Sequence, residues 1–104
     1  MRRHEIVEQI RKAAHDMSPH VQVILYGSEA RGDARIDSDI VLLALVDTDK
    51  LSYSEKEAIM TPFYDIELET GVVISTLIMP RHEWENRPFM TPFQYNVKRD
   101  GVIL

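Results

Sequence analysis

The sequence contains no cysteine. Disulfide bonds, thiolate nucleophiles and cysteine-ligated zinc are therefore excluded as sources of stability or chemistry. It also lacks a long apolar run, because the longest one, residues 40–46, is far shorter than the roughly 20 residues that a membrane-spanning helix needs. We find no charged and then apolar leader, so we expect a soluble, unprocessed chain without membrane contact, in the cytoplasm by default.

Basic residues are in the minority. The 12 Lys and Arg residues stand against 17 Asp and Glu residues, which leaves a net charge of −5. This sign disfavours a protein that wraps the backbone of a long nucleic acid, since such binding depends on neutralising phosphates. We therefore expect no extended nucleic-acid surface. The basic residues near the two ends of the chain are expected on solvated helix faces. They are Arg2, Arg3, Arg11, Lys12, Lys98 and Arg99.

The size of the chain and its apolar pattern predict one α/β domain. With 104 residues, 44% of them hydrophobic, there is material for one core, and we expect a single domain over residues 1–104. The alternation of helices and strands favours a small sheet covered by helices. Helices are predicted at 4–17, stopping near Ser18, at 29–33, 52–70 and 91–100, strands at 21–26, 40–46 and 72–79, and an apolar tail at 102–104.

Two of these elements have special features. Residues 40–46 are consecutively apolar, which is typical of a strand covered on both faces, so this is the expected central strand. Pro62 lies inside the predicted helix at 52–70 and is expected either to kink it or to divide it in two.

The segment between Leu25 and Asp47 carries the residues with chemical meaning. Gly27 follows a strand and allows a sharp turn, and Ser28 begins the next helical turn with a hydroxyl and free backbone N–H groups. Together they predict a phosphate cradle. Asp39, at the start of the central strand, is placed to hold a divalent cation against phosphates bound in that cradle.

This arrangement resembles the signature of the polymerase-β-like nucleotidyltransferase superfamily. In that signature Gly-Ser is followed by Arg-Gly and then by Ser-Asp-x-Asp at the start of a hydrophobic strand. The matching residues here are Gly27, Ser28, Ala30, Arg31, Gly32, Ser38 and Asp39. The resemblance to the minimal, single-domain branch of the superfamily is close in this motif and looser in the helix, strand and helix that follow, so most of the chain is consistent with it. The resemblance implies the nucleotidyltransferase fold, with a small mixed three-stranded sheet flanked by helices.

The resemblance also implies a reaction. A nucleoside monophosphate would pass from a nucleoside triphosphate such as ATP to a hydroxyl acceptor, with Mg²⁺ ions that activate the attacking oxygen and neutralise the leaving pyrophosphate. On this basis Gly27 and Ser28 bind the nucleotide together with Arg31 and Ser38, and Asp39 is the catalytic, metal-binding residue.

The sequence departs from the family pattern at the second acid. The pattern has an aspartate two residues after the first, because residues i and i+2 of a strand point to the same face. This sequence has Val41 there, and valine cannot coordinate a cation. A third acid would lie on the next strand, yet residues 72–79 contain none, and Ser75 stands about where it would be. Asp37 is the remaining candidate for a second metal ligand, and it precedes the strand in a predicted loop.

Other charged and polar residues in these segments have plainer interpretations. Arg31 is equally well explained as a surface residue paired with Asp33 or Asp37. The acids Asp65, Glu67 and Glu69 are expected on a solvated helix face.

Three functions stay open from sequence. The chain is an active nucleotidyltransferase, a catalytically silent binding module such as the antitoxin partner of a HEPN-domain toxin, or a nucleotide-binding sensor. A chain of this size has no room for the domains with which larger members hold base and acceptor, so we expect a protein partner or a homodimer. The aromatic residues near the C-terminus are expected to pack in the core or to form that interface. They are Trp84, Phe89, Phe93 and Tyr95.

Overall fold

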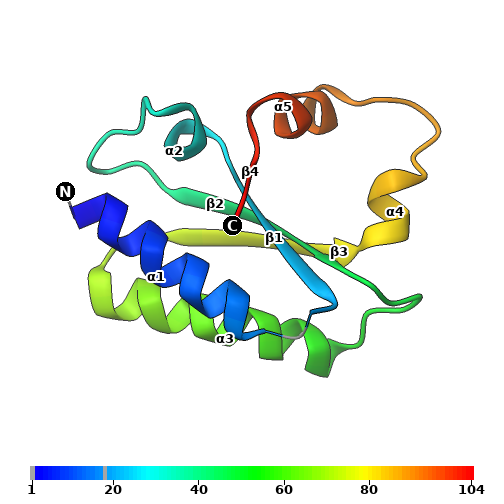
Figure 1. Ribbon diagram of the computed structural model, residues 1–104, viewed down its shortest axis with the longest axis horizontal. Coiled ribbons are helices and arrows are strands. Elements are labelled where there is room, and N and C mark those ends of the chain that lie inside the picture. Colours follow the sequence, from blue (N-terminus) through cyan, green and yellow to red (C-terminus); the bar gives the residue numbers. More distant parts are fainter. Residues whose placement is uncertain (1, 18) are drawn as a thin grey trace.

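A computed structural model describes residues 2–17 and 19–104. Ser18, where the first helix was predicted to stop, and the side chain of Arg2 lie outside this described part. Along the chain (Figure 1) the elements are α1 Arg2–Asp16, β1 Val21–Tyr26, α2 Ser28–Arg31, β2 Ile40–Val46, α3 Tyr53–Thr70, β3 Ile74–Pro80, α4 Arg81–Glu85, α5 Pro92–Asp100 and β4 Val102–Ile103. None of the helices in the described part has the length and apolar character that crossing a membrane requires.

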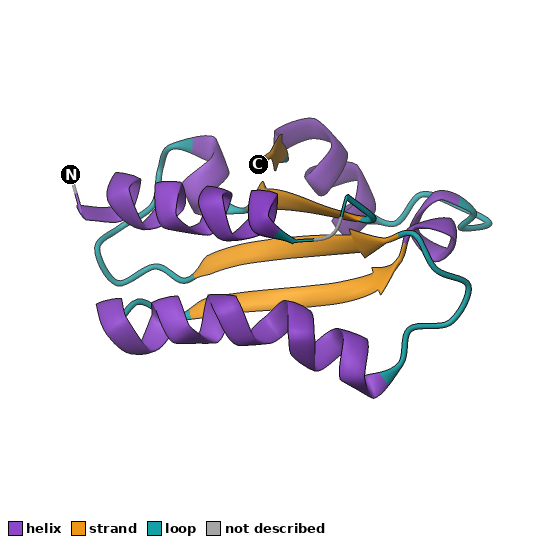
Figure 2. Cartoon of the chain, turned by 60° about the horizontal axis from the view of Figure 1, so that its bottom comes forward, coloured by secondary structure: helices purple, strands orange, loops and turns teal. Residues whose placement is uncertain are grey.

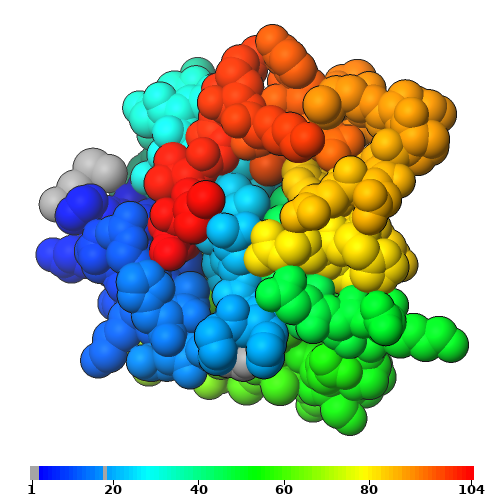
Figure 3. Space-filling model, turned by 45° about the vertical axis from the view of Figure 1, so that its right-hand side comes forward, coloured from blue at the N-terminus to red at the C-terminus, as the bar shows by residue number. Residues whose placement is uncertain are grey.

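The strands form one mixed sheet in the order β3-β2-β1-β4. β2 lies at its centre, as predicted, antiparallel to β1 and parallel to β3. The prediction of three strands is wrong by one, because the C-terminal tail pairs with β1, with Ile103 opposite Ile24. Leu104 N donates to Val23 O at 2.9 Å. In Figure 3 these last residues (red) lie against the α1 and β1 surface. A strand of two residues is too short to leave a period in the sequence.

Helices cover the sheet on both faces (Figures 1 and 2). Side chains of a strand alternate between the faces, so the even-numbered residues of β2 pack against α1 and α3, and the odd-numbered ones face α4 and α5. We call the first face the closed face and the second the open face. On the closed face the sheet contacts two long helices, whose main buried residues are Ile6, Ile10 and Ala14 of α1 and Ile59, Phe63 and Ile66 of α3.

α3 is one helix from end to end. Ser52 and Glu55 form a capping box at its start, and Gly71 ends it with a φ of 75°. Pro62 lies inside it, so the predicted division of this helix is wrong. A proline removes one backbone donor from a helix, and here the buried face formed by Ile59 and Phe63 on either side of Pro62 holds the helix together across the gap.

The segment after α3 differs from the prediction in two ways. β3 begins at Ile74, two residues later than predicted, and Ile74 N donates to Glu67 Oε1 at 2.8 Å. Glu67 is therefore not part of a solvated face. The helix α4 was not predicted, since it is a single short turn region whose one buried residue is Trp84. Gln94 of α5, itself buried, donates to Trp84 O at 2.9 Å and ties α4 to α5.

The C-terminal aromatic residues divide between core and surface. Trp84 is buried and Phe93 packs against it, with their rings edge to face at 5.9 Å. Phe89 and Tyr95 are exposed. The expected core packing therefore holds for the first pair, and the second pair lies on the surface of the open-face layer.

Candidate functional site

The turn from β1 into α2 requires glycine at position 27. Gly27 has a φ of 79°, in the left-handed region that residues with a Cβ rarely adopt. A Cβ at this position would also lie 2.7 Å from Val41 Cγ2. Gly27 O then accepts from Arg31 N at 3.1 Å, so α2 begins directly after the turn. The first N–H groups of a helix have no partner within it, so those at the start of α2 are the donors that the predicted phosphate cradle would use.

The connector between α2 and β2 is held by its own polar groups. Asp33 N donates to Ser28 O at 3.0 Å, and Arg35 N donates to Ser38 Oγ at 2.9 Å. Ser38 thus has a structural role that the sequence did not indicate. Asp37 and Asp39 are both exposed, one in a turn of this connector and the other directly before β2.

Arg31 is a surface residue paired with Asp33, which is one of the two interpretations that the sequence left open. Its Nε lies 3.4 Å from Asp33 Oδ2, and both side chains are largely exposed. An exposed pair at this separation is weak and does not hold the guanidinium in place. Arg31 also acts on α5, because its charge contributes, after the hydrogen bond from Arg99, to lowering the pKa of Asp100.

Arg3 is the residue of this region that the sequence interpretation missed. It is 4% exposed, although it was expected on a solvated helix face, so that prediction is wrong. Lys12, Lys98 and Arg99 are exposed as expected. The helical period contained the signal, because Arg3 shares the buried side of α1 with Ile6 and Ile10.

Arg3 ties α1 to the signature segment through three hydrogen bonds. Its Nε donates to Glu29 Oε1 at 2.7 Å, and its terminal nitrogens donate to Ser38 O at 2.8 Å and Ile36 O at 3.3 Å. One buried guanidinium therefore fixes the first turn of α2 and the end of the connector relative to each other. The positions of Ser28 and Asp39 depend on this contact.

The open face beside Asp39 lacks a second carboxylate. Val41 lies between Tyr26 of β1 and Ser75 of β3 in the register of the sheet, so Ser75 is the residue next to the missing acid. Among residues 2–17 and 19–104, no group of three or more His, Asp or Glu side chains is placed to hold a metal ion. A two-magnesium site needs several carboxylates to balance its charge. The donor set of Asp39, Val41 and Ser75 does not fit such a site.

Tyr26 lies beside Val41 and covers part of the open face there. Its ring packs edge to face against Phe93 at 5.5 Å, and burial raises the pKa of its hydroxyl above the usual value. The phenol therefore stays neutral at physiological pH. The surface near Val41 is partly apolar, with neutral hydrogen-bonding groups from Tyr26 and Ser75.

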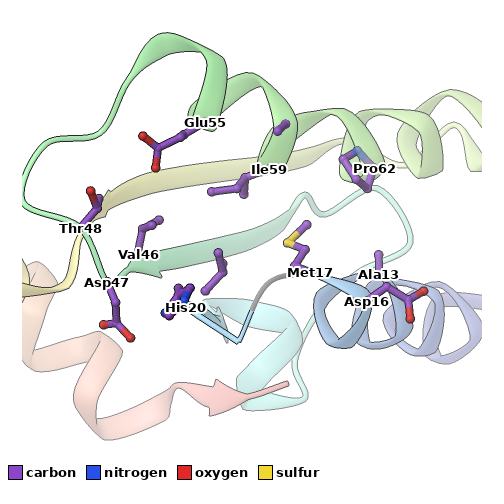
Figure 4. Close-up of a pocket in the computed structure, with 12 residues that line it drawn as sticks. Ala13, Asp16, Met17, His20, Val46, Asp47, Thr48, Glu55, Ile59 and Pro62 are labelled. Atoms are coloured by element: carbon purple, nitrogen blue, oxygen red, sulfur yellow. The ribbon is translucent and has the colours of Figure 1, made fainter.

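A separate cavity of about 620 Å³ lies at the other end of β2. Figure 4 shows Glu55, Ile59 and Pro62 of α3 across from Val46 and Met17. Its lining is mainly apolar side chains, and it includes none of the residues predicted from the signature. No local sequence pattern indicates this cavity, because its walls come from α1, α3 and the ends of β1 and β2. The polar residues of its lining are Asp16, His20, Asp47, Thr48 and Glu55.

Comparison with known proteins indicates the family and the fold of the chain. The family model described as "Nucleotidyltransferase domain" matches residues 7–90. No curated protein matches the chain. Among solved structures, one described as "Crystal structure of the toxin-antitoxin with AMP-PNP" is similar, with a TM-score of 0.61 and 18% sequence identity, over 92% of this chain and 69% of that chain. At this identity the likeness concerns the fold, and the predicted fold is confirmed.

Proposed function

Because the chain belongs to the nucleotidyltransferase domain family, we propose that it binds a nucleoside triphosphate on the family fold without catalysing metal-dependent transfer. It would act as a binding module, as an antitoxin does in a toxin–antitoxin pair. The observation that supports this most strongly is Val41. Its side chain stands where the second metal-binding acid of the family signature is expected, and no neighbouring strand supplies another.

The charge of the site supports a silent function. Two divalent cations beside one exposed carboxylate, Asp39, would keep most of their charge uncompensated. The methyl group of Val41 that faces Gly27 also makes this corner of the site apolar. An apolar group next to a cation removes hydration without replacing it, which is unfavourable. Both effects oppose the binding of Mg²⁺ where catalysis would need it.

Binding of the triphosphate, unlike metal-dependent transfer, does not require a second carboxylate. The backbone N–H groups at the start of α2 and the Ser28 hydroxyl are donors for phosphate oxygens. The contact between Arg31 and Asp33 is exposed and weak, so it does not prevent the guanidinium from turning toward a bound phosphate. We propose these groups as the nucleotide site, with Asp39 at its edge.

A protein partner follows from the same proposal. The solved structure described as a toxin–antitoxin with AMP-PNP has the same fold. We propose that this chain likewise works in a complex, where occupation of the nucleotide site stabilises the surface around α2 that the partner would recognise.

The test is calorimetric titration with α,β-methylene-ATP, which cannot release pyrophosphate, in the presence and absence of Mg²⁺. It compares the chain with Val41→Asp. We expect the unmodified chain to bind without a requirement for Mg²⁺, whereas Val41→Asp gains about tenfold in affinity when Mg²⁺ is added, because a second carboxylate then completes the site.

The matched control is Leu77→Asp. Leu77 is exposed, and it lies on β3 one alternation along from Ser75, so this change adds the same charge to the same face away from Asp39. It should leave Mg²⁺ dependence unchanged. If Mg²⁺ strengthens binding to the unmodified chain as much as to Val41→Asp, then Asp37 serves as the missing ligand and the chain is an active transferase. Absence of nucleotide binding in every variant would overturn the nucleotide site.

A further inference from the structure

α3 has two apolar faces. One is buried in the closed-face core and consists of Ile59, Phe63 and Ile66. The other points to solvent and is formed by Tyr53, Met60, Tyr64 and Leu68, which are 80%, 46%, 56% and 65% exposed. We call these four residues the α3 stripe. The last three follow at intervals of four residues, so they lie one above the other along the helix.

Such a stripe is unusual on a surface helix. A helix that covers a sheet normally has one apolar side, with polar residues opposite it. Single exposed apolar residues are common on proteins, but a line of four large ones on one helix is the pattern of an interaction surface. Figure 2 shows α3 along the flank of the molecule beside β3, away from α2 and α5. The stripe is therefore distinct from the candidate nucleotide site.

The charges of α3 indicate what covers the stripe. The helix contains five acidic residues and one basic residue, and its last turn has no basic residue. Glu67 and Glu69 lie near the C-terminal end, where the helix dipole is negative and acidic side chains are unfavourable. Glu67 is bound to Ile74 N, whereas Glu57, Asp65 and Glu69 are exposed beside the stripe. Basic groups of a partner would relieve this repulsion.

A second copy that pairs through the same stripe does not provide those groups. Two α3 helices packed antiparallel through their stripes would place Asp65 and Glu69 of one copy near Glu57 of the other. The single Lys56 of each helix cannot balance these carboxylates. Like charges at a helix interface are destabilising, and they select against that pairing.

We propose that the α3 stripe is a docking surface for an amphipathic helix of a partner protein, whose apolar side is flanked by Lys and Arg. Tyr64 lies at the middle of the stripe and is its central anchor, since tyrosine offers a large apolar ring with little loss of rotamer freedom. The basic flanks meet Glu57, Asp65 and Glu69. This inference stands independently of whether the nucleotide site is occupied or active.

The probe is a designed, fluorescein-labelled peptide with Leu at helical i, i+3, i+4 and i+7 spacing and Lys at its other positions. Its counterpart keeps the leucines and has Glu in place of Lys. Binding is followed by fluorescence anisotropy. We expect the Leu/Lys peptide to bind and to lose about tenfold in affinity with the triple variant Met60→Ser, Tyr64→Ser, Leu68→Ser.

The matched control is the triple variant Ile36→Ser, Phe89→Ser, Met90→Ser, which removes the same number of exposed apolar side chains elsewhere. It should bind the peptide like the unmodified chain, and circular dichroism checks that both variants are folded. Equal loss in the two variants, no binding at all, or equal binding of the Leu/Glu peptide would each overturn the proposal. So would dimerisation of the free chain that the stripe variant alone abolishes, because the occupant would then be a second copy.

Discussion

The two faces of the sheet differ in how completely helices cover them. On the closed face, Ile40, Leu42 and Ala44 of β2 are each 0% exposed beneath α1 and α3. On the open face, α4 and α5 bury Leu43 and Leu45 but leave Val41 only partly covered. The uncovered part of the sheet is the end where β1 turns at Gly27 and β2 begins after Asp39.

This difference separates stability from binding. The closed face holds most of the buried apolar residues, so we expect the stability of the domain to depend more on this face than on the residue at position 41. The open end has backbone donors and polar groups at the surface, which a ligand needs and a core does not. A family signature can therefore lose an acid at Val41 while the fold that surrounds it persists.

The largest expected effect contrasts one large residue from each face. Phe63 of α3 is 1% exposed in the closed-face core, and Phe63→Ala should lower the free energy of unfolding by about 3–5 kcal/mol through lost burial and a cavity. Leu77→Ala on the open face, where Leu77 is 41% exposed, should cost less than about 1 kcal/mol. Urea denaturation followed by circular dichroism measures both. Equal costs would mean that the two faces are equally covered and would remove the distinction.

The second prediction concerns the contact that joins the closed-face layer to the site. Arg3→Met removes a buried cation and leaves Glu29 without its partner, which should cost about 3 kcal/mol. Arg11→Met breaks the exposed pair with Glu8 on the same helix and should cost less than about 1 kcal/mol. The same denaturation measurement distinguishes them.

A second readout locates the effect of Arg3→Met. Hydrogen exchange of the connector, residues 33–38, should become faster in this variant, because Ile36 O and Ser38 O lose their donors. The double variant Arg3→Met, Glu29→Gln should recover part of the lost stability, since it removes the unpaired carboxylate. Unchanged exchange in the connector would show that Arg3 serves the core alone.

The long, strongly patterned elements could be predicted from the sequence. The strands at Val21–Tyr26 and Ile40–Val46 have the predicted bounds, because a β-branched run before glycine and a continuous apolar run are strong local signals. α5 starts at Pro92 with Thr91 as its cap, as the Thr-Pro pair indicated. The elements missed, α4 and β4, are short and defined by what they pack against. Trp84 and Ile103 owe their structure to tertiary contacts that no local pattern contains.

The candidate site divides in the same way. Gly27, Ser28 and Asp39 belong to one short signature segment and could be identified from the sequence alone. Arg3, which bonds to this segment, comes from another helix. The signal for it in the sequence is a charged residue on the apolar side of α1, where an unpaired charge would be unfavourable. Ser75 pairs with Val41 in the register of β2 and β3, about where the sequence predicts the residue that replaces a third acid.

The smallest of the three expected effects tests the open end directly. Gly27→Ala should lower the free energy of unfolding by about 2 kcal/mol, because alanine at a positive φ is strained and its Cβ would meet Val41 Cγ2. Gly32→Ala provides the matched control, since Gly32 has a φ of 83° with nothing within 4 Å of an added Cβ. It should cost about 1 kcal/mol, from backbone strain alone.

The contact between Gly27 and Val41 can then be isolated by a double-mutant cycle. In a Val41→Ala background the Cγ2 atom is gone, so Gly27→Ala should cost no more than Gly32→Ala does, and the coupling between positions 27 and 41 should be about 1 kcal/mol. A coupling near zero would mean that the backbone of the turn shifts to accommodate the new Cβ, so that Val41 Cγ2 causes no steric strain there. The full coupling would mean that Val41 constrains the phosphate-binding turn sterically, in addition to removing a carboxylate from it. Replacing Val41 would then change both the metal chemistry of the open end and the freedom of its backbone.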